Sequence, residues 1–221
     1  VKISFINEMA NLADKVGADV HTIARAMGLD GRISSKFLHP GPGYGGSCFP
    51  KDTEALVYTG EQHGVDFQVV KAAIGANKNQ RSVILAKAHE LLPEMSGKTV
   101  AILGLAFKAN TDDVRDTPAL EIIQGLEDAG AVVRAYDPIA AENMKQFFLP
   151  NLDTRQTVIE TVQDADLVII LTEWNELRGL GLKELKAHLR SPNIVDARNI
   201  LSIDQLKEFG YNYRNVGRSN I

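Results

Sequence analysis

Leu167-Val168-Ile169-Ile170-Leu171 decides the fold of this chain, because five apolar residues stand in a row between polar Asp166 and Thr172. A short apolar run of this kind is typical of a strand that is buried on both faces. Outward from it, further strands are predicted over 99–103, 132–136, 193–195 and, more weakly, 213–216. Helices are predicted between them, over 118–129, 140–148, 157–164, 182–189 and 203–209. Strands that alternate with helices predict a doubly wound parallel sheet over residues 98–221.

The first part of the chain carries a helical pattern instead. Ile3, Ile6 and Ala10 open an apolar repeat at intervals of three and four residues. Helices are predicted from the start to about 16, then over 19–27, 50–64 and 67–92. Asp19 suits the N-cap of the second helix, and Pro50 suits the first turn of the third. The stretch 93–97 is the natural linker. We therefore expect an α/β protein with an all-helical domain over 1–93 and the sheet domain over 98–221.

The predicted helix over 67–92 is longer than a small domain needs, and its middle, 77–81, is strongly polar. We expect such a helix to span an interface between two subunits, which predicts a homodimer. The apolar repeat of the first helix is already running at Val1, which is not a methionine. We therefore expect the chain to be a piece of a longer protein.

Composition argues against several classes of function. The 221 residues are 44% hydrophobic and 24% charged with a formal net charge of −4, which gives no general attraction to nucleic acid or to acidic membranes. No apolar run approaches the roughly 20 residues that span a bilayer. The five histidines are scattered without the spacing of metal ligands, so no metal site is expected. A single cysteine rules out an internal disulfide and suits the reducing cytoplasm.

Gly41-Pro42-Gly43-Tyr44-Gly45-Gly46 matches the dinucleotide fingerprint G-x-G-x-x-G in letters only. That fingerprint works where it joins a buried strand to a helix, so that a pyrophosphate meets the helix N-terminus. The residues before Gly41 do not form such a strand, and prolines interrupt the turn. In the Rossmann-like sheet that follows, Gly104 comes after the first strand, but the later glycines are missing. We therefore expect no dinucleotide site here; the glycine loop instead lets backbone amides approach a ligand.

Cys48 stands directly before Phe49-Pro50-Lys51-Asp52, where Pro50 predicts the start of a helix. Unpaired backbone amides and the helix dipole at such a terminus stabilise anions, and Lys51 adds a positive charge. A thiolate is an anion, so the position predicts that Cys48 is a nucleophile. Asp52 lies four residues on and can share a helix face with Cys48, where it could handle a proton or a water. On these residues alone, a small buried cysteine remains the alternative.

Five segments, in order and spacing, resemble the UDP-glucose/GDP-mannose dehydrogenase family, and the likeness covers essentially the whole chain. The family's catalytic-cysteine motif resembles Pro42-Gly43-Tyr44-Gly45-Gly46-Ser47-Cys48-Phe49-Pro50-Lys51-Asp52. Its second signature resembles Gly104-Leu105-Ala106-Phe107-Lys108 followed by Asp112-Asp113-Val114-Arg115-Asp116. The opening residues 6–11, the turn 30–33 and the late stretch Asp196-Ala197-Arg198-Asn199 also fit.

The resemblance implies an NAD-dependent oxidation of UDP-glucose to UDP-glucuronate by two hydride transfers. It implies that Cys48 adds to the intermediate aldehyde as a thiohemiacetal, which becomes a thioester, and that Asp52 helps to activate the hydrolytic water. The family's NAD-binding domain, and its catalytic lysine and asparagine, would precede Val1, so Lys2 and Asn7 are not given those roles. Without that domain, the isolated 221 residues are expected to show no turnover.

The same resemblance implies further site residues. Arg32 would reach the sugar nucleotide bound in the neighbouring subunit, whereas Lys51 and Arg115 would touch NAD. Phe107 and Lys108 would hold uridine and phosphate. The residues expected along the substrate are Phe37, Leu38, His39, Gly41, Tyr44 and Gly45, with Arg198 nearby. Asp112, Asp113 and Asp116 are expected to orient Arg115 or to solvate the turn, and Asp137 is expected to have a structural role.

Three alternatives stay open. Within the family, a GDP-mannose or UDP-N-acetylmannosamine dehydrogenase is the nearest, although Tyr44 and the Phe107-Lys108 pair favour the UDP-glucose branch. A second class is a non-catalytic dimerisation and UDP-binding module. A thiol hydrolase would need an orienting histidine beside Cys48, and no motif in the sequence nominates one.

Overall fold

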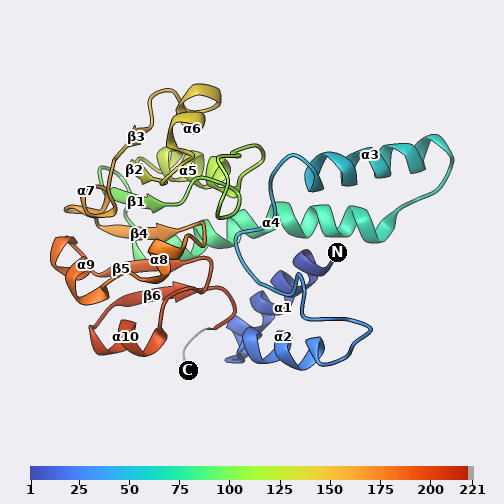
Figure 1. Cartoon of the computed structure of the whole chain (residues 1–221), viewed down its shortest axis with the longest axis horizontal. Coiled ribbons are helices and arrows are strands. Elements are labelled where there is room, and N and C mark those ends of the chain that lie inside the picture. The colour runs from blue at the N-terminus through green and yellow to red at the C-terminus, as the bar shows by residue number, and fades with distance from the viewer. Residues whose placement is uncertain (219–221) are drawn as a thin grey trace.

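The structure is a computed structural model that describes residues 1–218. Within them, the second half of the chain forms a six-stranded sheet in the order β3-β2-β1-β4-β5-β6, and every neighbouring pair is parallel (Figure 1). The order reverses between β1 and β4, which is the switch point of a doubly wound sheet. The predicted Rossmann-like sheet is therefore confirmed. The strands are β1 Thr99–Leu103, β2 Val132–Tyr136, β3 Asp153–Thr154, β4 Leu167–Ile170, β5 Asn193–Asp196 and β6 Asn212–Asn215.

Helices connect these strands, and most of them lie where the sequence predicts. The helices are α5 Pro118–Asp128, α6 Ala141–Phe147, α7 Val158–Val162, α8 Asn175–Arg178, α9 Leu182–His188 and α10 Ile203–Glu208. The sequence did not predict β3 or α8, because elements of two and four residues are too short to show a periodicity. The weak strand predicted over 213–216 is confirmed as β6, one residue earlier.

The first part of the chain is helical, as predicted: α1 Lys2–Val16, α2 Val20–Gly28, α3 Phe49–Gln62 and α4 Gln68–Leu91. The Asp19 carboxylate accepts hydrogen bonds from two backbone amides of the first turn of α2, which confirms the N-cap. Helix α2 runs to Gly28, one residue beyond the predicted end at 27. A Cβ on Gly28 would lie 2.9 Å from the Cα of Ser35, so glycine serves a close approach of the chain.

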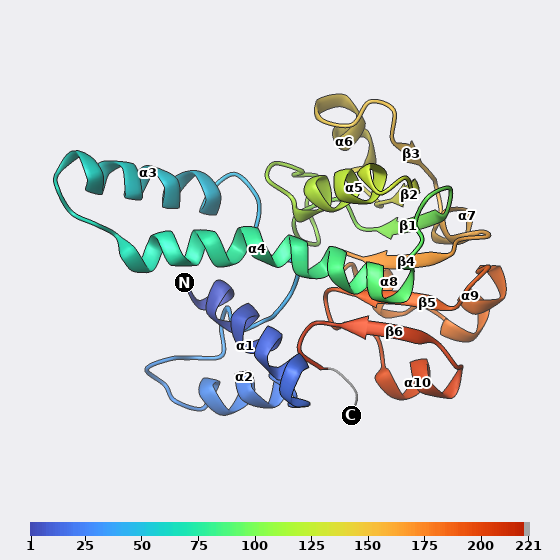
Figure 2. The same cartoon turned by 180° about the vertical axis from the view of Figure 1, so that it is seen from behind.

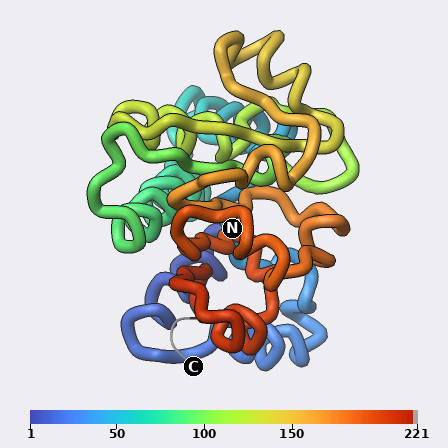
Figure 3. The backbone as a smooth tube through the Cα atoms, turned by 90° about the vertical axis from the view of Figure 1, so that its left-hand side faces the viewer, coloured from blue at the N-terminus to red at the C-terminus, as the bar shows by residue number. Residues whose placement is uncertain are grey.

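Helix α4 joins the two parts of the molecule. Its N-terminal half runs beside α3, and this pair projects from the body (Figures 1 and 2). Its C-terminal half packs against α1, α5 and the strands of the sheet (Figure 2). The end of the described chain returns to the N-terminal helices (Figure 3), where Val20 N donates to the Gly217 carbonyl at 2.8 Å.

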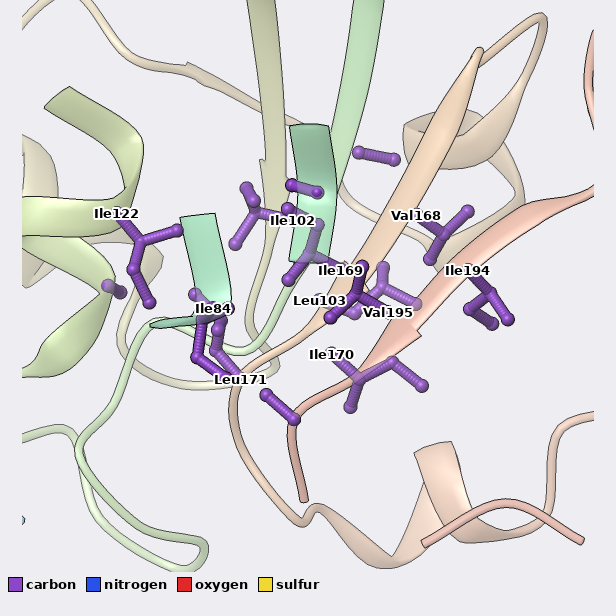
Figure 4. Packing of buried hydrophobic residues seen from close by; sticks show 14 of the residues in the cluster. Ile84, Ile102, Leu103, Ile122, Val168, Ile169, Ile170, Leu171, Ile194 and Val195 are labelled. Atoms are coloured by element: carbon purple, nitrogen blue, oxygen red, sulfur yellow. The ribbon is translucent and has the colours of Figure 1, made fainter. Parts of the chain in front are cut away.

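The core lies on the central strands. Ile102, Leu103, Ile169 and Ile170 are completely buried, and so is Ile84 of α4, which packs against the sheet (Figure 4). The same buried cluster continues into α1. The continuous apolar run at 167–171 is thus buried on both faces, as expected for a central parallel strand.

Candidate active site

A cleft of about 470 Å³ lies between the glycine loop, residues 41–47, and the carboxyl ends of the parallel strands. Its walls come from distant parts of the sequence. Cys48 belongs to the start of α3, Phe107 and Lys108 follow β1, Glu173 follows β4, and Arg198 follows β5. Doubly wound sheets bind their ligands at this edge, next to the switch point. The cleft is therefore the place where this fold would hold a ligand.

Cys48 is the N-cap residue of α3, is exposed, and lines the cleft. Its carbonyl accepts the first hydrogen bond of the helix, from Asp52 N at 2.8 Å, and Pro50 occupies the first turn. The unpaired amides of a helix N-terminus therefore lie next to the thiol. The predicted helix start is confirmed, and the alternative of a small buried cysteine is excluded.

Two cations lie near this thiol. Lys51 Nζ donates to the Asp52 carboxylate at 2.6 Å, and this hydrogen bond raises the pKa of Lys51. Arg115 donates two hydrogen bonds of 2.9 Å to Asp113, which raise the pKa of Arg115 and confirm that Asp113 orients it. The negative charge of a Cys48 thiolate adds a smaller contribution to both shifts. Both cations are therefore within electrostatic reach of the sulfur.

Asp52 is not one of the residues that line the cleft. Its carboxylate is exposed and paired with Lys51, although it stands in the first turn of α3 with Cys48. An ion pair between exposed side chains is worth little free energy, about 0–1 kcal/mol, and opens readily. Any part that Asp52 plays in proton transfer would require this opening.

The glycine loop is packed too tightly to accept side chains. A Cβ on Gly45 would lie 2.3 Å from the Asp116 carbonyl oxygen, and a Cβ on Gly46, whose φ is 82°, would lie 2.8 Å from the Phe107 ring. The residues before the loop, 31–40, form turns and irregular chain rather than a strand. The interpretation of Gly41–Gly46 as something other than a dinucleotide fingerprint is therefore confirmed.

Arg198 is held at the side of the cleft by fixed hydrogen bonds. Its Nε donates to the Leu171 carbonyl at 2.7 Å, and its Nη2 donates to the Phe107 carbonyl at 2.9 Å. The Glu173 carboxylate lies 3.1 Å from Nε, and burial lowers the pKa of the arginine. The remaining nitrogen, Nη1, faces Gly41, where a Cβ would lie only 3.4 Å from it. The side chain is thus oriented in advance, at the same cleft as Cys48.

Phe107 and Lys108 form the wall beside it. Lys108 Nζ lies 5.3 Å from the centre of the Phe107 ring, a distance at which a cation is attracted to the ring face. This pair offers a flat apolar surface next to a positive charge. The combination suits a ligand that has both an aromatic base and a phosphate.

Asp137 binds the backbone that follows the first two strands of the sheet. Its Oδ2 accepts from the backbone amides of Leu105 and Ala106 at 2.8 and 3.0 Å and from Trp174 Nε1 at 3.1 Å. Its other oxygen accepts from two further amides. The amides after β1 that would face a pyrophosphate are therefore already bound, and α5 begins only at Pro118. Asp137 thus holds the turns after β1 and β2 in place, which confirms its expected structural role.

Some of the other expected site residues lie along the cleft, and others lie away from it. Phe37, His39, Gly41, Tyr44 and Gly45 lie along the cleft. The Leu38 side chain does not, because it is 2% exposed and belongs to the core. Arg32 lies on an exposed turn, where its Nη2 pairs with Asp30 at 2.5 Å and the side chain is 90% exposed. Arg115 lines a neighbouring hollow instead of the cleft.

Sequence reasoning missed a buried polar face on α4. Asn77, Gln80 and Arg81 are all less than a tenth exposed, and they contact the glycine loop and the segment after β1. The sequence contained a signal for this burial. The three positions are spaced i, i+3 and i+4, and they continue the apolar face that includes Ile84 and Ala88. Polar residues in register with a core stripe indicate buried hydrogen bonds rather than a solvated face.

Two family models match the chain. The central domain of the UDP-glucose/GDP-mannose dehydrogenase family matches residues 1–79, and the UDP binding domain of the same family matches residues 101–203. The chain belongs to this family. As a family member it combines the helical central region with the Rossmann-like UDP binding domain, in agreement with the fold described above.

Curated relatives are similar over nearly the whole chain. It is 47% identical over 223 residues to the UDP-glucose 6-dehydrogenase of Rhizobium meliloti, covering 99% of the chain and 50% of that protein. It is 43% identical to the UDP-glucose 6-dehydrogenase TuaD of Bacillus subtilis, covering 98% of the chain and 47% of that protein. The chain thus spans about half the length of the curated relatives that it matches.

Solved structures give the same result. A UDP-glucose dehydrogenase from Pyrobaculum islandicum superposes with a TM-score of 0.86 at 33% identity, covering 96% of the chain and 47% of that structure. A UDP-D-ManNAc dehydrogenase from Pyrococcus horikoshii gives a TM-score of 0.84 at 27% identity, covering 100% of the chain and 49% of that structure. The likeness in fold therefore extends to relatives that act on different sugars.

Two further observations concern residues 1–218. No group of three or more histidine, cysteine, aspartate or glutamate side chains is gathered there as metal ligands would be. Within the same range, no helix has the length and apolar character needed to cross a membrane.

Proposed function

We propose that the chain supplies the catalytic cysteine and the UDP-binding surface of a UDP-glucose 6-dehydrogenase, which oxidises UDP-glucose to UDP-glucuronate with NAD. One observation carries this proposal: Cys48, at the N-terminus of α3, shares a single cleft with Phe107, Lys108 and Arg198. A nucleophile and a nucleotide-binding surface are thus combined in one site. The curated relatives named above support UDP-glucose as the substrate.

In the proposed reaction, two NAD molecules in succession would each accept one hydride from C6 of the glucose unit. The first oxidation converts the alcohol to an aldehyde. The Cys48 thiolate then adds to the aldehyde carbon, and the resulting tetrahedral thiohemiacetal can give up its hydrogen as a hydride. Loss of that hydride leaves a thioester, which water cleaves to the carboxylate and the free thiol. The sulfur that begins this sequence stands at the N-terminus of α3, next to the unpaired backbone amides of the first turn.

The walls of the cleft suit the rest of the substrate. We assign the uracil ring to Phe107, and the diphosphate to Lys108 and the prearranged guanidinium of Arg198. The remaining contacts with the sugar come from Phe37, His39, Gly41, Tyr44 and Gly45, and from the backbone at Leu38. Arg32, being exposed on its turn, is free to reach the substrate of a neighbouring subunit.

Lys51 and Arg115 are proposed to touch NAD held by a domain outside this chain. Both are exposed cations, and Cys48 is exposed as well. Asp52 would release Lys51 when that cation engages the cofactor, and the freed carboxylate could then activate the water that cleaves the thioester. We place this chemistry in the cytoplasm, where a free catalytic thiol stays reduced.

We also propose a homodimer through α4. Helices α3 and α4 project from the body. They expose Leu56 and Val69, which is 65% exposed, and the turn between them exposes Val65. Light scattering should show twice the chain mass at micromolar concentration. Val69→Glu should convert the dimer to a monomer. Lys78→Glu, which also adds negative charge to an exposed position of α4, is the control and should leave the dimer intact. A monomeric wild-type chain would contradict this part of the proposal.

Turnover by the full-length protein tests the function directly. We expect NADH formation with UDP-glucose, and its loss in the variant Cys48→Ser, because a hydroxyl is a far weaker nucleophile than a thiolate. GDP-mannose and UDP-N-acetylmannosamine serve as competing substrates. Turnover with either of these alone would replace UDP-glucose in the proposal. Full activity of the Cys48→Ser variant would exclude the covalent mechanism.

The isolated 221 residues provide a second test. We expect no NADH formation from them, but measurable binding of UDP by calorimetry, because the cleft with Phe107, Lys108 and Arg198 is complete. Arg198→Ala should weaken UDP binding at least tenfold, and Arg190→Ala, which removes an arginine at the opposite end of the sheet, should not. Equal affinity of the two variants would show that UDP binds elsewhere.

A further inference from the structure

The loop that leads to Cys48, residues 41–47, is held by hydrogen bonds from amide side chains of α1 and α4. Asn77 of α4 binds the backbone of Tyr44 twice: Tyr44 N donates to Asn77 Oδ1 at 2.8 Å, and Asn77 Nδ2 donates to the Tyr44 carbonyl at 3.0 Å. The side chain therefore pairs with the loop as a neighbouring strand would. Gly43 makes this approach possible, because a Cβ there would lie 2.8 Å from Asn77 Oδ1.

A second set of hydrogen bonds holds the loop three residues earlier, at Gly41. Gly41 N donates to Asn7 Oδ1 at 2.9 Å, and Gln80 Nε2 donates to the Gly41 carbonyl at 3.0 Å. Asn11 Nδ2 in turn donates to Gln80 Oε1 at 3.0 Å and fixes the orientation of that amide. Both polar groups of the Gly41 backbone are thus bound by side chains from α1 and α4.

Helix α4 also reaches the opposite wall of the loop. Arg81 Nη2 donates to the Asp116 carbonyl at 3.4 Å, and that carbonyl oxygen is the atom that Gly45 approaches most closely. Gly46 N donates to the Arg115 carbonyl at 2.8 Å. The loop between Gly41 and Gly46 is therefore clamped between α4 and the segment after β1.

We propose that Asn77 and Gln80 are positioning residues that hold the cysteine loop at a fixed distance from the nucleotide-binding wall. This inference rests on the proposed function. Asn77 is 3% exposed and Gln80 is 1% exposed, and burial of amides costs free energy unless each is hydrogen-bonded. If these two positions of α4 served only for packing, apolar side chains would be buried there at a lower cost in free energy. The two amides instead bind the backbone of residues that lead directly to Cys48.

Fixed geometry matters for the proposed chemistry, because the sulfur must meet C6 of a sugar whose nucleotide is held by the other wall. A displacement of about 1 Å can reduce the rate of such a step about 100-fold. Helix α4 spans both walls, so its polar face sets their separation. The expectation is a loss in kcat, with little change in the KM for NAD, because Asn77 is buried inside this chain and acts only through the loop.

Hydrogen exchange of the 221-residue chain tests the clamp without requiring turnover. Asn77→Leu should speed exchange of the amides of residues 41–48 at least tenfold, because it removes both hydrogen bonds between Asn77 and the Tyr44 backbone. The matched control is Asn79→Leu, on the exposed side of the same helix, which should leave this exchange unchanged. Gln80→Met is a second variant, with similar shape, in case Asn77→Leu does not fold. Unchanged exchange of the loop, or equal acceleration throughout the sheet, would overturn the proposal.

Kinetics of the full-length protein test the consequence. Asn77→Leu should lower kcat with UDP-glucose about tenfold or more, and change the KM for NAD by less than about twofold. Equal kcat in the Asn77→Leu and Asn79→Leu proteins would also overturn it. Absence of turnover in the wild-type protein would instead reject the proposed dehydrogenase, while the exchange experiment would still decide whether the clamp exists.

Discussion

At the scale of single residues, buried carboxylates fix the loops that form the site. Asp137 accepts hydrogen bonds from four backbone amides and one indole, and Asp196 accepts from the amides of Arg198 and Leu201. Burial raises the pKa of Asp196, although its backbone hydrogen bonds act in the opposite direction. Each acid ends a strand and orders the turn that follows. The residues after β1 and β5 therefore keep their places without a ligand.

Asp137→Asn should destabilise the chain markedly. An asparagine has only one acceptor oxygen, so at least two of the five donors would lose their partner, and its amide would face other N–H groups. We expect the free energy of unfolding to fall by about 2–3 kcal/mol, since unpaired buried donors each cost about 1–3 kcal/mol. Urea denaturation measures this change. Asp128→Asn, at the exposed end of α5, is the control, and equal losses in both variants would contradict the argument.

The sequence could indicate the nucleophile but not its surroundings. Pro50 after Cys48 was enough to place the thiol at a helix start. Nothing in the spacing showed that Lys51 would pair with Asp52, or that Leu38 would turn into the core while His39 faces the cleft. Such choices depend on contacts with distant segments. They become visible only when the chain is folded.

At the scale of elements, α4 shows both the strength and the limit of pattern reasoning. Its length and bounds were predicted within one residue at each end. Its length was interpreted as a sign of an interface between subunits, whereas the burial of its polar middle was missed: Asn77, Gln80 and Arg81 are buried within this chain. The proposed dimer stays a prediction that rests on the exposed residues of α3 and α4. Periodicity located the helix, whereas only the hydrogen bonds revealed what its polar face contacts.

Gly75→Ala should stabilise α4. Gly75 lies inside the exposed half of the helix, and a Cβ there would meet no atom within 4 Å. Alanine restricts the unfolded chain without creating a clash, so the free energy of unfolding should rise by about 0.5–1 kcal/mol. Gly125→Ala in α5 is the comparison, because its Cβ would lie 2.6 Å from a methyl group of Leu85. If a thermal melt showed the same increase in stability for Gly125→Ala as for Gly75→Ala, the contacts of the added Cβ would not determine the change in stability.

At the scale of the whole molecule, the cleft exists only because two regions with different patterns meet. The sheet was predictable from apolar runs, and the first helices were predictable from their periodicity. The packing of these two regions against each other was not predictable, because no local pattern indicates that residues 41–48 pack on the segment 105–117. The resemblance of the motifs to a known family supplied that link, and the structure supplied the distances. The boundary predicted between the helical and sheet domains, at 93–98, stays a prediction, because one buried cluster extends across both regions.

The contact between these regions should respond to pH through His21. This residue lies on α2 where the chain end returns, with its Nε2 3.4 Å from Asn199 Nδ2. Partial burial lowers the pKa of His21, and the positive charges of Arg218 and His39 act in the same direction, against a smaller opposing effect of Asp19. The folded chain therefore binds a proton here less readily than the unfolded chain, whose histidine has a pKa of about 6.5.

The sign of the pH effect follows from this difference. Above pH 6.5 both states are neutral at His21, and the folded chain carries no penalty. As the pH falls below about 6.5, the unfolded state takes up the proton first, so stability decreases toward acid. We expect the free energy of unfolding, measured with urea at pH 7.5 and at pH 5.5, to decrease less in His21→Gln than in the wild type. Arg218→Gln should also reduce the decrease, because it removes a charge that opposes protonation. An identical pH dependence in the wild type and both variants would show that this junction does not sense pH through His21.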